Sequence, residues 1–119
     1  MGNFRNLLVW QIAKDLAIKI YKLTREDELS KDFSLRDQMQ RAAISIASNI
    51  AEGDELGTDK QSIRHFYISR GSVAELTTQL LISYEIGYIN NSTKDALIND
   101  CDKIRAMLIK LIKARSELK

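Results

Sequence analysis

Residues 38–53 have the sequence QMQRAAISIASNIAEG, and this stretch decides the fold predicted for the 119-residue chain. Its apolar residues recur at intervals of three and four, which is the period of one face of an α-helix. Ala42 and Ala43 on this face are small enough to let a second helix approach closely. A similar stretch, SRGSVAEL, follows at residues 69–76. Both stretches place charged and small polar residues beside the apolar face. A buried charge needs a partner, so these residues either form pairs within the fold or have a function.

Three further stretches show the helical period, and the chain has no proline and only five glycines to interrupt them. We predict four helices, at residues 7–24, 35–51, 59–86 and 93–116. Residues 25–33 mix charges without an apolar period, and we predict a loop there. Short connections between long amphipathic helices favour antiparallel neighbours. The expected fold class is therefore all-α, an antiparallel up-and-down four-helix bundle, with residues 1–119 forming a single domain.

Short sequence signals indicate where these helices begin and end. A Ser or Thr three residues before an acid or amide is typical of a helix N-terminus. Three such pairs occur: Ser34 with Asp37, Thr58 with Gln61, and Ser92 with Asp95. Gly53 and Gly87 are predicted to end helices, because glycine accepts the left-handed conformation common there. Gly71 falls in mid-helix, where close contact with another helix would explain it.

The composition limits the class of protein. The net charge is +2, which is far from the strong basic excess of a dedicated nucleic-acid binder. The single cysteine, Cys101, cannot form an intramolecular disulfide, which favours a reducing compartment. The N-terminal ten residues lack the pattern of a signal peptide, and no apolar run approaches the ~20 residues that cross a bilayer. We expect a cytoplasmic protein with no membrane contact.

Catalytic chemistry finds little support in the sequence. His65 is the only histidine, so no multi-histidine metal site can form within one chain. We expect it to be a semi-exposed helix residue, and we expect Cys101 to be a buried small apolar residue. No glycine-rich phosphate loop and no Glu-x-x-His motif of di-metal bundles occurs. The prediction is therefore no catalytic residues, no metal, no cofactor and no enzyme activity.

The polar residues of the two central stretches have two interpretations. Arg70 falls at a heptad position between Phe66 and Val73, where burial would require a partner, and Glu52 and Glu75 are candidates. The first interpretation is a structural network that fixes helix register or a subunit interface; the second is a ligand or nucleic-acid site. The residues assigned to the network are Arg41, Asn49, Glu52, Ser72 and Glu75.

Basic residues gather near the C-terminus, where residues 103–119 hold six cations and one acid. Cations at a helix C-terminus stabilise it through the macrodipole, which is one explanation. The other is that clustered cations bind the phosphate backbone of nucleic acid. The candidates for that role are Lys103, Arg105, Lys110, Lys113 and Arg115.

The chain resembles the four-helix-bundle proteins encoded in intervening sequences of bacterial 23S rRNA genes. The resemblance spans nearly the whole chain. The motifs that carry it are Val9-Trp10, Arg41-Ala42-Ala43, Asn49-Ile50-Ala51-Glu52-Gly53, Gly71-Ser72, Glu75-Leu76 and Gly87-Tyr88. That family is related to the accessory protein of diversity-generating retroelements, a pentameric barrel that binds nucleic acid and a reverse transcriptase. The resemblance implies a homopentamer without enzymatic activity.

Two functions therefore stay open. The first is a non-catalytic homo-oligomeric bundle that binds RNA or DNA weakly through phosphate contacts. The second is an interaction scaffold or adaptor for another protein, without a nucleic-acid role, which the near-neutral charge favours.

Overall fold

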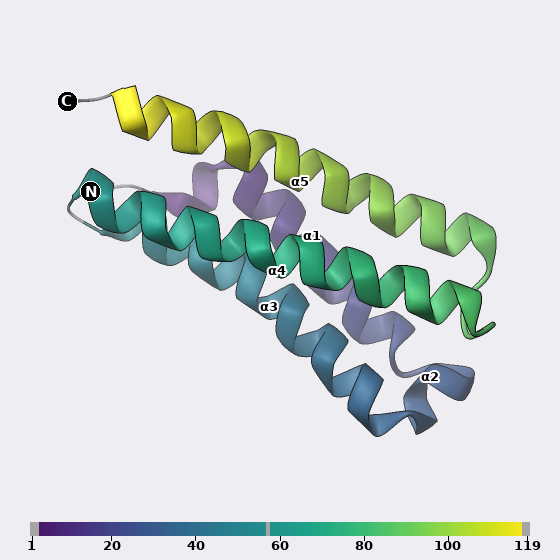
Figure 1. Ribbon diagram of the computed structural model, residues 1–119. Helices are drawn as coiled ribbons and strands as arrows, with labels where there is room; N and C mark the ends of the chain where they lie inside the picture. Colours follow the sequence, from purple (N-terminus) through teal and green to yellow (C-terminus); the bar gives the residue numbers. More distant parts are fainter. Residues whose placement is uncertain (1–2, 57, 118–119) are drawn as a thin grey trace.

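The computed structural model describes residues 3–56 and 58–117, and it is built from helices. Its four long helices follow one another up and down the molecule (Figure 1). They are α1 (Leu8–Leu23), α3 (Phe33–Glu55), α4 (Asp59–Glu85) and α5 (Asn91–Glu117). Two short elements complete the order: η1 (Phe4–Asn6) and α2 (Asp27–Lys31). No strand occurs in the described residues, and the predicted all-α antiparallel bundle is confirmed.

The four long helices form an elongated body of 48 × 21 × 19 Å. Helix α1 packs against α3 and α5, and α4 packs against the same two helices from the other side. Helices α1 and α4 therefore occupy diagonal corners, with α4 in front of α1 in Figure 1. The helix α1 begins, and the helix α5 ends, at the same end of the bundle.

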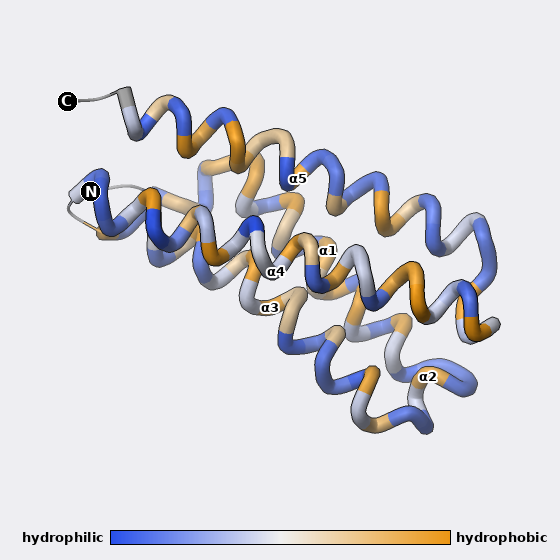
Figure 2. The backbone as a smooth tube through the Cα atoms, viewed as in Figure 1, coloured by the Kyte–Doolittle hydropathy of each residue, from blue (hydrophilic) through white to orange (hydrophobic). Residues whose placement is uncertain are grey.

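The core is formed by one apolar stripe from each long helix. Apolar and polar positions alternate around every helix in Figure 2, so each helix has one buried and one exposed side. Ala42 and Ala43 are buried as expected, and Cys101 is fully buried among the apolar residues of α5. The largest fully buried side chains include Phe66, Leu16, Ile20, Met39, Ile46, Ile50, Leu76, Leu80, Ile104 and Leu108.

The predicted loop at residues 25–33 is partly wrong, because it contains the short helix α2. Leu29 in this helix is 1% exposed and belongs to the core. One buried leucine thus holds an otherwise charged segment against the bundle. Helix α3 begins directly afterwards, at Phe33, and its N-cap is Asp32 rather than Ser34. The Asp32 carboxylate accepts a hydrogen bond from the backbone N–H of Leu35 at 3.2 Å.

The predicted C-terminus of α3 and the predicted N-cap of α5 also need correction. Helix α3 continues past Gly53 to Glu55, so Gly53 does not end it. Gly53 is buried instead, with its backbone close to the Phe66 ring of α4. Helix α5 is capped by Asn90 rather than Ser92, since the Asn90 side-chain oxygen accepts from the backbone N–H of Thr93 at 2.8 Å.

Helix α4 begins and ends where the sequence predicts. The Thr58 hydroxyl accepts from the backbone N–H of Gln61, and Gly87 follows the last turn with φ +87°. The explanation offered for Gly71 is wrong, because it is exposed and no atom lies within 4 Å of the place where its Cβ would be.

Four serines of α4 lie in the interface with the rest of the bundle. Ser62, Ser69, Ser72 and Ser83 are all buried. Ser69 donates to the carbonyl of Ile46 and Ser62 to the carbonyl of Gly53, so both tie α4 to α3. These side chains are small, which permits close packing of α4 against α3.

Candidate nucleic-acid interface

Three lysines of α5 lie on its outer side. Lys103, Lys110 and Lys113 are exposed, and their spacing of seven and three residues places them on one face of the helix. None of the ion pairs among the described side chains involves them. Their ammonium groups are therefore available to an anionic partner.

Arg115 differs from these lysines because the protein itself holds its guanidinium. It donates to Asp54 Oδ1 at 2.9 Å, and its Cζ lies 5.4 Å from the centre of the Phe66 ring. The Asp54 side chain is only 5% exposed. The contacts of Arg115 join α5 to α3 and α4, so we assign it to the packing of the bundle rather than to a phosphate site.

A shallow groove between α4 and α5 brings two arginines and an aromatic ring together. It has a volume of about 310 Å³, and its lining includes Arg70 and Tyr67 from α4 and Arg105 from α5. The Arg70 guanidinium lies 5.5 Å from the centre of the Tyr67 ring, which is 54% exposed. Gly71 contributes a surface without a side chain. An aromatic face beside guanidinium groups suits a nucleobase and its phosphate.

The structure thus gives Arg70 a different environment from the one predicted. The sequence placed it on the core face and required a carboxylate partner, yet it is half-buried and lies over Tyr67. No ion pair among the described residues includes it. The inward position is taken by Ser69, which is fully buried.

The central polar residues form a short hydrogen-bonded chain across α3 and α4. The Ser45 and Ser72 hydroxyls lie 2.8 Å apart, and Asn49 donates to the Ser45 carbonyl at 2.9 Å. With its amide so oriented, Asn49 Oδ1 accepts from His65 Nδ1 at 2.8 Å. Two residues of the predicted network, Asn49 and Ser72, are therefore linked through Ser45, while His65 is a participant that the sequence did not indicate.

The other three residues of that predicted network, Arg41, Glu52 and Glu75, are exposed. Arg41 and Glu75 line a second groove of about 460 Å³ between α3 and α4. Within the described part of the chain neither Arg41 nor Glu75 nor Glu52 forms an ion pair. The geometry therefore separates a partly buried serine–asparagine–histidine chain from a solvated charged surface.

His65 and Cys101 are the two residues with catalytic potential, and both lie at least partly within the bundle. His65 is half-buried, as expected, and engaged by Asn49. Burial raises the pKa of the Cys101 thiol to about 11, so the nucleophilic thiolate is scarce at neutral pH. Over the described ranges, no three His, Cys, Asp or Glu side chains gather in a way that could hold a metal ion.

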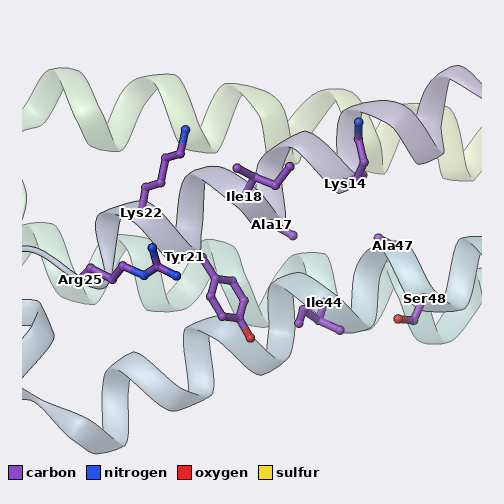
Figure 3. Close-up of a pocket in the computed structure, with 9 residues that line it drawn as sticks. All are labelled: Lys14, Ala17, Ile18, Tyr21, Lys22, Arg25, Ile44, Ala47 and Ser48. Atoms are coloured by element: carbon purple, nitrogen blue, oxygen red, sulfur yellow. The ribbon is translucent and has the colours of Figure 1, made fainter.

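A third groove lies between α1 and α3, and the sequence did not indicate it. Its volume is about 470 Å³. Figure 3 shows Tyr21 reaching from α1 toward α3, with Ile44 and Ala47 on the α3 side. Ile18 and Ile44 in this groove are 47% and 46% exposed. The complete lining is Lys14, Ala17, Ile18, Tyr21, Lys22, Arg25, Ile44, Ala47 and Ser48.

The sequence held only a partial signal for these surfaces. The α5 cations were found because they cluster along the chain. The groove between α4 and α5 was missed because Arg70 and Arg105 are far apart in sequence and meet only after folding. The groove between α1 and α3 left one pattern in the sequence, which is an isoleucine that lies among cations at helical spacing.

Comparisons with known proteins agree on the family and the fold. The sequence model of the family described as 23S rRNA-intervening sequence protein matches residues 5–110. The structure is similar to a crystal structure of a protein of unknown function from the S23 ribosomal protein family of Bacteroides thetaiotaomicron. The TM-score is 0.83 at 25% sequence identity, over 89% of this chain and 99% of that one. No curated protein matches the chain. Among the described residues, no helix is long and apolar enough to span a bilayer.

Proposed function

The chain belongs to the 23S rRNA-intervening sequence protein family, and from this premise we propose that it is a non-catalytic, cytoplasmic homo-oligomer that binds RNA weakly through phosphate contacts. The observation that carries the proposal is the groove between α4 and α5, where Arg70 and Arg105 lie beside the exposed ring of Tyr67. The exposed lysines of α5 continue the positive surface on the outer side of the same helix.

The groove offers two kinds of contact with a single strand. The guanidinium groups can pair with phosphate oxygens, and phosphate contacts supply affinity without sequence preference. The Tyr67 ring can stack on a base, which is worth about 1–3 kcal/mol and tolerates any sequence. The two contacts differ in salt dependence, because only the phosphate contacts release counterions. Measurement of binding over a range of salt concentrations therefore separates them.

Assembly is the second part of the proposal. One copy carries only +2 in net charge, so a single patch is a weak binding site. A symmetric oligomer repeats the patch and adds the fields of its copies. The resemblance to the accessory protein of diversity-generating retroelements supports five copies. The exposed apolar residues of α1, α3 and α4 give such an assembly surfaces to bury.

The absence of catalysis is proposed from the state of the reactive side chains. A nucleophilic role for Cys101 would require a lowered thiol pKa, whereas burial raises it. His65 Nδ1 donates to Asn49, which leaves Nε2 as the basic ring nitrogen. Among the described residues, no hydrogen bond joins Nε2 to a hydroxyl or thiol that it could activate.

The test is fluorescence anisotropy of a labelled single-stranded RNA of about 20 nucleotides over a series of salt concentrations. Each phosphate contact adds about 0.7 to the log–log salt slope for single strands. We expect R70Q/R105Q to lower this slope by about 1.4. The Y67A variant should weaken binding with an unchanged slope. R41Q, which neutralises an exposed arginine on α3, serves as the matched control and should change neither.

Two results would overturn the proposal. One is the absence of RNA binding even at low salt. The other is a salt slope and affinity for R70Q/R105Q that equal those of the R41Q control.

The second candidate function is a scaffold for another protein, and the apolar groove between α1 and α3 favours it. Purification of the tagged chain from its native cells distinguishes the two candidates. A stable protein partner with no bound RNA supports the scaffold, whereas RNA recovered in a nuclease-sensitive complex supports the first proposal.

A further inference from the structure

The groove between α1 and α3 combines an apolar floor with a positive rim. Lys14, Lys22 and Arg25 line it together with half-exposed isoleucines, and its lining contains no acidic residue. Lys14 is paired with its neighbour Asp15, but the ion pairs of the described residues leave out Lys22 and Arg25. A surface of this kind fits a partner that is apolar along its centre and negative at its edges.

The C-terminal half of α4 has the complementary chemistry. Residues 71–93 contain no lysine or arginine. Leu81 and Ile82 are 40% and 46% exposed on this half of the helix, and Glu75 and Glu85 are exposed beside them. This half of α4 therefore carries two exposed carboxylates and exposed apolar side chains but no cation of its own. Arg41 of α3, which lines a groove with Glu75, and Lys94, which lies over the Tyr84 ring, are at its edges.

We infer that the acidic half of α4 from one copy lies in the groove between α1 and α3 of the next copy. The inference rests on the homo-oligomer of the proposed function and identifies its contact surfaces. The lengths agree: residues 14–23 of α1 and residues 75–85 of α4 span about 14 and 15 Å at 1.5 Å per residue, and Arg25 follows the end of α1. The isoleucines of the groove are buried by Leu81 and Ile82, and the cations face the two glutamates.

The two surfaces lie on different sides of one molecule, since α1 and α4 occupy diagonal corners of the bundle. A contact between unlike surfaces is heterologous, so each copy gives its α4 to one neighbour and receives the α4 of another. Such a contact forms a ring where the rotation closes. A two-fold dimer, which uses the same surface twice, does not result from it. The lysines on the outer face of α5 belong to neither contact surface.

Sedimentation velocity of the full chain, at micromolar concentration and low salt, tests the contact. We expect K22E/R25E to raise the dissociation constant about tenfold or more and to shift the protein toward monomer. We expect E75K/E85K to do the same, because either variant places like charges across the contact. The chain that carries all four substitutions regains opposite charges and should assemble again. Circular dichroism confirms that each variant keeps its helices.

The matched control is K60E/R64E, which reverses one exposed lysine and one exposed arginine outside both surfaces, as K22E/R25E does within the groove, and should assemble like the wild type. The possible results separate this inference from the proposed function. A monomeric wild type contradicts the proposed homo-oligomer itself. If the wild type is oligomeric but K22E/R25E and E75K/E85K behave like the control, only the proposed contact is contradicted. A fourfold variant that stays dissociated also contradicts only the contact.

Discussion

Replacing Gly53 with alanine is expected to destabilise the bundle, although alanine is the better helix former. Gly53 lies in the last turns of α3, where its backbone faces the fully buried ring of Phe66. A Cβ at this position would lie 2.5 Å from Cε1 and 2.9 Å from Cδ1 of that ring. Both distances are shorter than any ordinary carbon contact. The ring also lies under the guanidinium of Arg115, so it cannot move without disturbing a second contact.

The magnitude follows from two opposing contributions. Alanine gains up to about 1 kcal/mol over glycine from helix propensity. Overpacking a well-packed core costs about 1–3 kcal/mol or more. Because the clash involves a fully buried aromatic ring, we expect the cost to exceed the gain, with a net loss of about 1–2 kcal/mol in the free energy of unfolding.

Gly71 supplies the matched control. It lies in the middle of α4, is exposed, and has no atom within 4 Å of its would-be Cβ. The same substitution there should stabilise the protein by about 0.5–1 kcal/mol. Urea denaturation at one fixed protein concentration measures both variants, since the stability of an oligomer depends on concentration. A G53A variant as stable as G71A would refute the packing explanation. In G53A/F66L, the smaller side chain should recover part of the loss.

Three further predictions follow from single contacts. R115A should lower the free energy of unfolding by about 2–4 kcal/mol in urea denaturation, because it leaves the buried Asp54 carboxylate without its cation, and D54N/R115A should cost less; equal costs would contradict this account. D32A should cost about 1 kcal/mol through loss of the α3 cap. It should also lower the raised pKa of Tyr88, which donates to Asp32, in ultraviolet titration; an unchanged tyrosine titration would contradict that hydrogen bond. Cys101 has a folded-state pKa of about 11, above the value near 9 of an exposed thiol, so the unfolded state ionises first. Stability should therefore fall between about pH 9 and 11, and C101A should lack this contribution; an identical pH profile in C101A would exclude the thiol as its source.

The fold was predictable because an apolar period recurs in all four long helices, most clearly in α1. The phase of α4 was harder to assign, because serines occupy inward positions of its seam. Ser69 and Ser83 are fully buried there, while the apolar Tyr84 is 37% exposed. The apolar spacing correctly placed Phe66 and Val73 in the core, but it also placed Arg70 inward, where Ser69 is buried instead. Hydrogen bonds from the serines to α3 and α4 backbone carbonyls satisfy their hydroxyls, which a sequence pattern does not reveal.

The roles of the two glycines were interchanged for a related reason. Gly53 was expected to end a helix and Gly71 to permit close packing, yet Gly53 permits the packing and Gly71 is free of neighbours. Glycine suits both purposes, and only the position of the opposing helix distinguishes them. The same applies to the candidate site, since sequence clustering found the lysines of α5 but not the neighbour of Arg105 across the groove.

Native mass spectrometry of the full chain at micromolar concentration, with and without a short single-stranded RNA, tests the central claim most directly. The account predicts a closed assembly, with five copies of the 13.6 kDa chain, to which RNA adds without dissociating it. A monomer that binds no RNA at low salt would contradict it.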